Sequence, residues 1–435
     1  MWEKFAANMS HDGLRAGMCS GLPRSLFSVW KMHYVPVMSV HVMARGSLVP
    51  IMLAIASGML AMGLALPALP LELQARFGCG TTMIGLIMGL QSGATLLSRP
   101  WAGRMADRRS GRDTLLAGLG WTACSGLAYM LALLPVLAPA MQQAMIVLGR
   151  MSMGLGEGLI VTGGGIWAVT LAAGSGRTGS AMSWVGLAIF AGLGVGTAIG
   201  GMIQAQAGFF YLCLVAVALP ASGMVLTLCL PPVRLHDGSH AGVQWKDLIG
   251  HTWTWGMTLG LSAVGFAAIS SFLVIFYAAR GWQGGGWALA MFGVGHVSAR
   301  LAGNHLVDRP DVRPMVATIM LTEAAGLALI WLAPGPAWGI AGSFLTGLGF
   351  SLTYPLLALP VLRQVPPAAA GSAIGLFDVF FDIASGAGSV LSGLLAGVAG
   401  PGSPFAMAML AALTGSMMML VLYNRQAVGA KTPAP

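Results

Sequence analysis

Charged side chains are scarce in this chain. Only 8% of its 435 residues are Asp, Glu, Lys or Arg, and 56% are hydrophobic, whereas a soluble protein carries about 25% charged residues. Apolar runs of roughly 20 residues, long enough to cross a bilayer, recur along the sequence, and the short alternating strands of an outer-membrane barrel are missing. The composition therefore predicts an all-α membrane protein with many transmembrane helices.

Cysteines and the motifs of catalytic or metal sites are scarce too. The five Cys residues are scattered without CxxC spacing, which indicates neither a disulfide framework nor a metal site. The sequence has no P-loop GK[ST] and no HExxH, and its glycine-rich run 154–165 follows no predicted strand. We therefore expect a protein that is not an enzyme, with no catalytic residue, no metal and no cofactor beyond a coupling proton.

The net charge of +9 favours the membrane over nucleic acid as a partner, because basic residues collect in the cytoplasmic loops of membrane proteins. If the segment before the first span is cytoplasmic, every Lys and Arg except Arg76, Arg150 and Arg280 belongs to the cytoplasmic side. This asymmetry predicts that both termini are cytoplasmic. We expect the lipid bilayer and a small solute as partners, no nucleic acid, and a monomer.

One long polar connection, residues 231–249 with Pro231 and Pro232, separates six expected spans from six others. It predicts an N-terminal bundle at 49–230, a cytoplasmic linker at 231–249, a C-terminal bundle at 250–425 and a cytoplasmic tail at 426–435. Residues 1–48 form a cytoplasmic extension, or else the start is misplaced and Met43 is the first residue. The expected spans are 49–70, 81–99, 114–137, 143–170, 180–205, 208–230, 252–279, 285–303, 314–333, 336–358, 370–397 and 403–423.

The two halves share a repeated pattern. Arg99, Asp107 and Arg108 return as Arg300, Asp308 and Arg309 at a constant offset of 201 residues. GLGEGL at 154–159 corresponds to GLGFSL at 347–352, and GSA at 179–181 corresponds to GSA at 371–373. These offsets agree on one duplication of a six-helix unit. Such halves usually enclose a site near the middle of the membrane.

The basic loop after the second span is a candidate gate. A charge-assisted hydrogen bond from Asp107 to an arginine of a neighbouring helix would close one side in one conformation and break in the other. Gly103, which has no side chain, would allow helices to approach closely. Topology alone is the alternative reading, and we favour it for Arg109 and Arg112. The gate and motif residues are Arg99, Gly103, Asp107, Arg108, Gly111, Arg112, Asp308 and Arg309.

Four acidic residues, Glu157, Glu323, Asp378 and Asp382, lie well inside predicted spans. An ionised side chain at the bilayer centre costs at least about 2.5–3.5 kcal/mol, so each must face the interior, pair with a cation or hold a proton. Asp378 and Asp382 share a helix face, and carboxylates that close resist double ionisation. We favour the deeper Asp382 as proton carrier, whereas a structural role suits Glu323 equally well.

Arg150 is the one basic residue well inside a predicted span. It shares a helix face with Glu157, about 10 Å away along the axis, so both can line one cavity without touching. Arg150 would hold an anionic solute group, tune an acid across the cavity, or simply bond a carbonyl. Four softer candidates complete the cavity, and His296 among them either titrates near pH 6.5 or bonds a backbone carbonyl. They are Gln91, Trp184, His296 and Tyr354.

Three motifs resemble those of the major facilitator superfamily, and the resemblance covers residues 49–425. GRMADRRSGR at 103–112 resembles the 2–3 loop signature, with one extra residue before Gly111. Arg150 with its following glycines at 154 and 156 resembles the fourth-helix motif. GLGVGTAIGG at 192–201 resembles the fifth-helix motif of antiporters, with Thr197 in place of the proline. The glycines of this last motif are Gly192, Gly196, Gly200 and Gly201.

The resemblance implies twelve helices in two bundles that expose a central site to each side in turn, and it assigns Asp107 the role of a conformational latch. The phrases GLQSGATLLSRPWAGRMADR and LGEGLIVTGGG also resemble a bacterial branch of arabinose-efflux-like permeases, to which staphylopine exporters are similar. We therefore expect export of a small polar organic solute across a bacterial inner membrane by proton antiport. A proton-coupled importer or facilitator is the alternative, and a non-transporting sensor or assembly protein is the alternative of another class.

Overall fold

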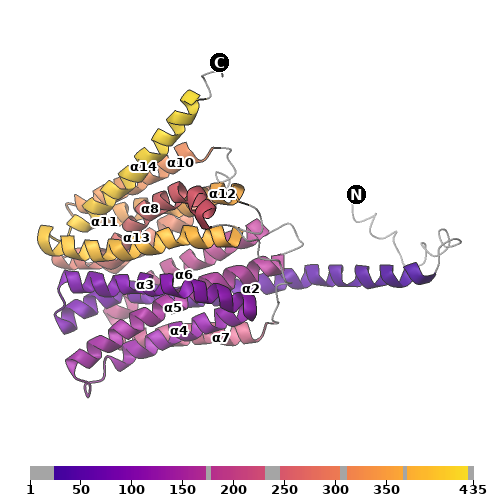
Figure 1. Cartoon of the computed structure of the whole chain (residues 1–435). Helices are drawn as coiled ribbons and strands as arrows, with labels where there is room; N and C mark the ends of the chain where they lie inside the picture. The colour runs from indigo at the N-terminus through magenta and orange to yellow at the C-terminus, as the bar shows by residue number, and fades with distance from the viewer. Residues whose placement is uncertain (1–23, 173–177, 231–244, 304–310, 366–369, 430–435) are drawn as a thin grey trace, which may run out of the picture. The chain divides into compact units, whose positions relative to one another are not determined.

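The computed structural model describes residues 24–172, 178–230, 245–303, 311–365 and 370–429 (Figure 1). The chain divides into two compact units, Met1–Val49 and Pro50–Pro435. The predicted extension 1–48 makes up nearly all of the first unit. The fold and the site described below belong to the second unit.

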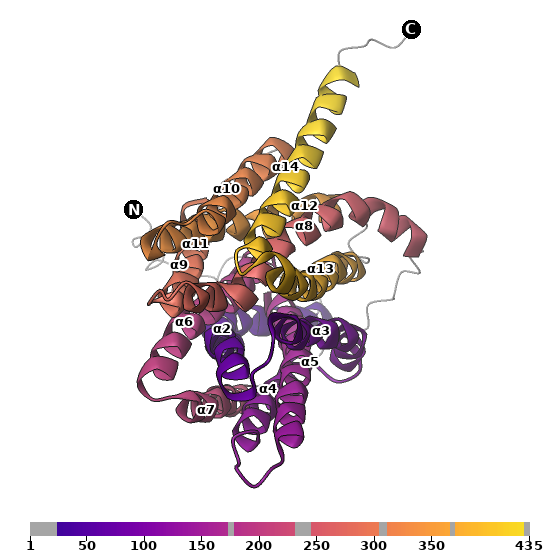
Figure 2. The ribbon, with the colours of Figure 1, turned by 90° about the vertical axis from the view of Figure 1, so that its left-hand side faces the viewer.

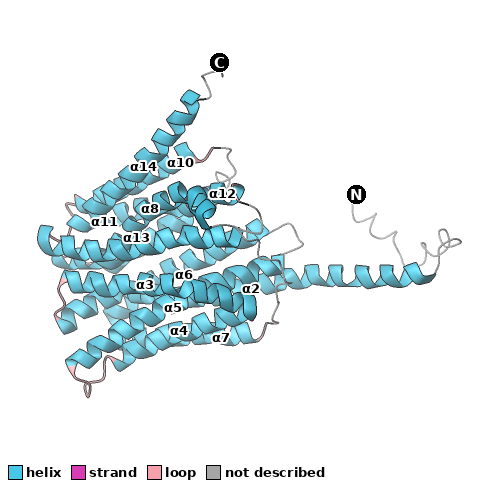
Figure 3. Ribbon diagram, in the orientation of Figure 1, coloured by secondary structure: helices cyan, strands magenta, loops and turns pink. Residues whose placement is uncertain are grey.

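Helices account for almost all of the described chain, and no strand occurs in that part (Figure 3). The helices of the first half are α2 (Arg24–Phe77), α3 (Thr81–Arg108), α4 (Gly111–Leu131), α5 (Pro139–Ala172), α6 (Thr178–Gln206) and α7 (Phe209–Leu228). Those of the second half are α8 (Trp245–Ala279), α9 (Gly285–Gly303), α10 (Arg313–Trp331), α11 (Pro336–Ser351), α12 (Thr353–Arg363), α13 (Ala370–Ala399) and α14 (Ser403–Gly429).

These helices confirm the predicted all-α membrane fold with twelve spans, α11 and α12 together forming the tenth. Within the described part of the chain, ten segments are long and apolar enough to cross a membrane, and Pro336–Arg363 is one of them. The other two spans, α3 and α9, carry Arg99 and Arg300 within the helix. The sequence thus places charge inside the two helices that occupy equivalent positions in the two halves.

The tenth span is interrupted, which the sequence analysis did not predict. Helix α11 ends at Ser351 and α12 begins at Thr353. Pro355 explains the interruption, since proline has no N–H to donate to the carbonyl four residues earlier and its ring crowds that carbonyl. Two predicted borders also shift. Helix α8 begins at Trp245, inside the expected linker, and α14 continues to Gly429.

The two views of the second unit show α2–α7 packed together as one group and α8–α14 as another (Figures 1 and 2). Among the described residues the groups meet mainly along two helix pairs, α3 with α13 and α6 with α9. Each pair joins a helix of the first half to a helix of the second. The second span and its pseudo-symmetric counterpart therefore both lie at the boundary between the halves.

The spans alternate in direction, so the connections gather at two ends. We call the end with the α3–α4 turn at Arg109 and Ser110 the basic end, and the end with the α2–α3 turn at 78–80 the opposite end. Turns at the opposite end are short and use glycine where the backbone has a positive φ, for example 86° at Gly208 and 91° at Gly400. Only glycine adopts such angles without strain.

Toward the opposite end the halves contact each other directly through helix backbone at glycine positions. A Cβ built on Gly85 of α3 would lie 2.5 Å from the Ser389 carbonyl oxygen and 2.9 Å from Gly393 Cα of α13. A Cβ on Gly201 of α6 would lie 3.1 Å from Gly286 Cα of α9. Small residues allow such close helix approach within a membrane. Glycine is therefore required on both of these helix pairs.

Candidate functional site

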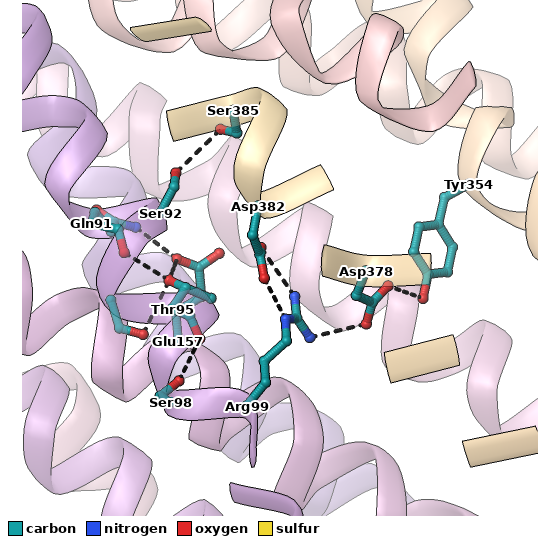
Figure 4. Close-up of polar contacts among 11 residues, drawn as sticks. Gln91, Ser92, Thr95, Ser98, Arg99, Glu157, Tyr354, Asp378, Asp382 and Ser385 are labelled. Carbon is teal, nitrogen blue, oxygen red and sulfur yellow. Dashed lines mark hydrogen bonds and ion pairs between the residues drawn. The ribbon is translucent and has the colours of Figure 1, made fainter. Parts of the chain in front are cut away.

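Arg99 of α3 reaches across the boundary between the halves and binds two acids of α13 (Figure 4). Its Nη1 lies 3.0 Å from Asp378 Oδ2. Its Nε donates to Asp382 Oδ2, and its Nη2 donates to Asp382 Oδ1 at 3.2 Å. A guanidinium fork that contacts a carboxylate through two nitrogens makes a strong and directional ion pair. We call Arg99, Asp378 and Asp382 the clamp.

The clamp is further ordered by Tyr354, near the start of α12. Its hydroxyl donates to Asp378 Oδ1 at 2.8 Å, so Asp378 bonds both Arg99 and Tyr354 (Figure 4). Tyr354 lies two residues after Leu352, which separates α11 from α12. The interruption therefore helps to position a ligand of the clamp.

The clamp is largely shielded from solvent and carries unequal charge. The side chains of Arg99, Asp378 and Asp382 are 15%, 11% and 3% exposed. One guanidinium faces two carboxylates, so the fully ionised clamp has one surplus negative charge. A shielded surplus charge is unfavourable. A proton on one aspartate would remove this surplus charge, and whether Asp382 carries one stays a prediction.

A second polar cluster lies within the first half and surrounds Glu157 of α5. Gln91 Nε2 donates to Glu157 Oε2 at 2.8 Å, and Thr95 Oγ1 donates to the same oxygen at 3.1 Å (Figure 4). Gln91 and Thr95 are one turn apart on α3, so they share a face. Arg99 follows one turn later, which places the two clusters in sequence along α3.

A polar cavity of about 30 Å³ lies between the halves and brings Arg150, Glu157 and Asp382 to one space. Hydroxyl groups from both halves complete its polar lining. Ser92 Oγ of α3 donates to Ser385 Oγ of α13 at 3.4 Å. A cavity needs about 10–15 Å³ to hold one water, so this one holds about two waters and no organic solute. A solute can enter only after the halves move apart.

Arg150 is 2% exposed and has no acidic partner within ion-pair distance among the described residues. Its Nη2 donates to the Met88 carbonyl at 3.3 Å, whereas its Nε and Nη1 have no hydrogen-bond partner in the described part of the chain. Arg150 and Glu157 thus line one cavity without bonding to each other. The buried arginine retains donors for another group.

The 2–3 loop residues are arranged differently from the predicted gate. Asp107 is exposed and forms no ion pair with any residue that the structure describes, and a Cβ on Gly103 would meet no atom within 4 Å. The close approach predicted at Gly103 is therefore absent from this conformation. Gly111 provides one instead, because its Cβ would lie 2.8 Å from the Gly163 carbonyl oxygen of α5. The latch role of Asp107 remains a prediction.

The remaining loop arginines lie apart from the clamp. Arg112 donates to the Thr227 and Leu228 carbonyls at 3.1 and 2.9 Å, and so caps the C-terminus of α7; a cation there also stabilises the helix dipole. Arg108 and Arg109 are exposed. The second-half candidates Asp308 and Arg309 lie outside the described residues.

The glycine motif of α6 packs in two directions. Gly192, Gly196 and Gly200 face α2 within the first half, where a Cβ would meet backbone atoms of Ala56, Leu60 and Leu64. Gly201 faces α9 of the second half instead. Thr197 donates its hydroxyl to the Gly194 carbonyl at 2.7 Å, within its own helix.

The weaker candidates separate clearly. Gln91 and Tyr354 belong to the polar clusters. Glu323 is fully buried inside the second half, accepts a hydrogen bond from Ser262 at 2.6 Å, and does not line the polar cavity. Trp184 is 57% exposed and points away from the interior. His296 bonds no carbonyl through its ring, because neither ring nitrogen has a partner among the described residues.

Sequence reasoning missed the small polar residues of the site. Thr95 bonds Glu157, and Ser92, Ser270, Ser271, Ser385 and Ser389 line the cavity. A signal was present, since Gln91, Thr95 and Arg99 recur at four-residue spacing and predict one polar stripe along the second span. Isolated serines carry no such signal, because they also pack against helices as small residues.

Known proteins agree with this architecture. The profile described as Major Facilitator Superfamily matches residues 51–384 and 283–435. An uncharacterized MFS-type transporter of Salmonella typhimurium is 33% identical over 370 residues, and the match covers 84% of this chain and 94% of the relative. An uncharacterized MFS-type transporter of Burkholderia mallei is 33% identical over 374 residues, and the match covers 85% of this chain and 90% of the relative. The crystal structure of the human organic anion transporter MFSD10 (TETRAN) shares the fold at a TM-score of 0.67 and 16% identity, covering 86% of this chain and 99% of that one. Two halves of six spans meeting around a polar cavity, together with this profile and these relatives, show that the chain belongs to the Major Facilitator Superfamily.

Proposed function

We propose that this protein exports a small polar organic solute across the bacterial inner membrane in exchange for protons, with both termini in the cytoplasm. The observation that carries the proposal is the clamp, in which Arg99 of the first half binds Asp378 and Asp382 of the second half. Because the clamp links the halves, it must break whenever they separate at the basic end. It therefore has the property of a gate.

The position of the clamp supports this role. Along α3 the cavity residues Gln91 and Thr95 precede Arg99, and the basic end follows it. Arg99 lies nine residues before the last residue of α3, or about 13 Å along the axis. The clamp thus separates the cavity from the end that the distribution of Lys and Arg assigns to the cytoplasm.

Asp382 offers a link between the clamp and protons. It bonds Arg99 and also lines the cavity, so a proton that enters the cavity reaches a ligand of the clamp. Protonation removes the charge that attracts Arg99, which favours opening at the basic end. Release of the proton to the cytoplasm and binding of solute there would then let the clamp form again. This order of events gives antiport.

Export is favoured over import by the glycine motif at 192–201 and by the resemblance to arabinose-efflux-like and staphylopine-exporting proteins. Thr197, which occupies the proline position of that motif, keeps a proton-coupled importer or facilitator as the alternative. A polar or zwitterionic solute suits a cavity with both Arg150 and carboxylates.

The test is proton movement in proteoliposomes loaded with a pH-sensitive dye. Sugars, opine-like zwitterions, carboxylates and cationic drugs are added in turn to wild type and to Asp382→Asn. We expect solute-dependent proton movement in wild type and none in the variant, with Glu323→Gln as the buried-acid control. Proton movement that persists in Asp382→Asn would exclude Asp382 as the carrier. No movement with any solute, from folded protein, would favour a facilitator or a non-transporting protein.

A further inference from the structure

Arg300 of α9 is a buried arginine that the proposed mechanism does not yet use. It is 8% exposed and lies at the boundary between the halves, with its guanidinium directed at α6. A Cβ built on Gly186 of α6 would lie 3.6 Å from Arg300 Nη2 and 3.7 Å from Nη1. The guanidinium therefore faces the one position of that turn that has no side chain.

The internal repeat explains this geometry. Arg300 corresponds to Arg99 at the offset of 201, and Gly186 corresponds to Asp378 at the offset of 192 set by the two GSA sequences. Phe190 corresponds to Asp382 by the same offset. The second half thus keeps the arginine of a clamp, whereas the first half lacks both carboxylates. In the clamp the equivalent arginine binds both acids.

Among the described residues, neither polar side chain on this face of α9 has a hydrogen-bond partner. Arg300 forms no hydrogen bond or ion pair with a described residue, and its Nε is buried without one. His296, one turn earlier, is 3% exposed, and neither of its ring nitrogens is bonded within the described residues. The His296 ring instead packs on the Phe190 ring, with 4.2 Å between the two ring centroids. A buried unpaired arginine is strongly unfavourable, so a partner in another state of the protein would stabilise it.

We propose that Arg300, with His296 beside it, binds a carboxylate of the transported solute at the boundary between α6 and α9, opposite Gly186. The inference rests on the proposed transport function and narrows the solute to a class, organic carboxylates. A planar guanidinium matches a carboxylate through two parallel hydrogen bonds. A carboxylate is also the group that the equivalent arginine binds in the clamp.

This assignment gives the solute a role in gating. The clamp closes α3 against α13 with groups of the protein alone. Between α9 and α6 the protein supplies only the arginine of the equivalent contact, and the carboxylate of a bound solute would complete it. Burial of Arg300 at this boundary would therefore be more favourable with solute bound, which favours exchange over leakage.

The first experiment uses no solute. Gly186→Asp places a carboxylate opposite Arg300, and Gly186→Asn is its neutral control of equal size. Both are made in wild type and in Arg300→Gln, and thermal unfolding of the full chain in phosphatidylcholine nanodiscs is followed. We expect Gly186→Asp to unfold a few degrees above Gly186→Asn only where Arg300 is present, because the pair is coupled. Equal unfolding midpoints for Gly186→Asp and Gly186→Asn, both with Arg300 present and in Arg300→Gln, would overturn the proposal.

The second experiment uses acetate, benzoate and succinate as probes, each compared with its neutral amide. We expect at least one carboxylate to raise the unfolding midpoint of wild type with increasing concentration. The shift should vanish in Arg300→Gln and in Gly186→Asp, where the new carboxylate occupies the place. Absence of any shift in wild type, or an equal shift in Arg300→Gln, would overturn the proposal.

Two further comparisons test whether the acidic group binds elsewhere or belongs to a lipid. A shift that is lost in Arg150→Gln but kept in Arg300→Gln would assign the acid group to the polar cavity and reject the proposal. An Arg300-dependent shift caused by phosphatidylglycerol in the nanodisc, with none from soluble carboxylates, would reject a soluble occupant. Substrate-dependent proton movement that continues with neutral solutes while carboxylates fail to bind would leave the proposed transport intact and reject only this site.

Discussion

Arg99 Nη1 lies 3.0 Å from Asp378 Oδ2, although the two residues are 279 positions apart and belong to opposite halves. Asp382 binds the same guanidinium. This contact measures the separation of α3 and α13 directly, because no motion that parts these helices near the basic end can preserve it. Its removal should therefore change the balance between conformations more than it changes the folding of either half.

Replacing Arg99 by glutamine should open the basic end. The change removes three hydrogen bonds between charged groups, each worth about 1.5–3 kcal/mol, and every 1.4 kcal/mol is tenfold in an equilibrium. A cysteine placed at Ser385, which lies on the cavity side of the clamp, reports the opening. Its labelling by an impermeant maleimide from the basic end should become at least about tenfold faster.

Two variants control this measurement. Arg104→Gln alters an exposed arginine whose one hydrogen bond to a described residue is to the Pro100 carbonyl, and it should leave labelling unchanged. Arg99→Lys keeps the charge but cannot span both aspartates with a planar fork, so it should give an intermediate rate. Equal labelling in Arg99→Gln and wild type would show that the clamp does not hold the basic end closed.

Tyr354→Phe should weaken the clamp without uncoupling proton movement from solute movement. The variant loses the 2.8 Å hydrogen bond to Asp378, which is worth about 1.5–3 kcal/mol to a charged group, while Asp382 and its contact with the cavity remain. We expect faster labelling at Ser385→Cys, and an unchanged number of protons moved per solute. A changed ratio would place Tyr354 on the proton pathway itself.

Gly85→Ala should impair closure toward the opposite end. Its Cβ would press on the Ser389 carbonyl oxygen and on Gly393 Cα of α13, and overpacking of this kind costs about 1–3 kcal/mol. Transport should slow, and labelling of Ser385→Cys from the opposite end should increase. Gly93→Ala on the same helix, whose Cβ would meet no atom within 4 Å, should behave as wild type; loss of function there would point to a general intolerance of α3.

Glu323→Ala should affect stability and leave coupling unchanged. Glu323 is fully buried in the second half and accepts the Ser262 hydroxyl at 2.6 Å. Removing it leaves that hydroxyl without its partner and opens a void, at a cost of about 1–3 kcal/mol. The thermal midpoint should fall, and the ratio of protons to solute should stay constant. A lost proton response in folded protein would instead make Glu323 a carrier.

The fold followed from patterns that are local in sequence. Apolar run length predicts a span, and the repeated offsets predict two halves, because each depends on neighbouring residues or on self-similarity. The interruption before Thr353 was missed, since GLGFSLTYP keeps the hydropathy of a span throughout. Pro355 was the available signal, as proline disturbs the helix one turn before it.

The site was predicted only in its parts. Arg99 was recognised as a motif residue, and Asp378 and Asp382 were recognised as buried acids, but their pairing depends on how two distant helices pack. Helical spacing shows which residues share a face and not which face they meet. One inference was within reach: Arg99 lies inside an apolar stretch, LLSRPW, so it required an acidic partner, and only four acids lay within spans.

The two halves contact each other through different chemical groups at their two ends. Toward the opposite end Gly85 and Gly393 bring backbone against backbone, and such a contact contains nothing that gains or loses a proton. Toward the basic end the contact is made of ionised side chains. Acidity, salt and charged cargo would therefore set the rate of separation at one end, while at the other end that rate would depend on shape and membrane pressure alone.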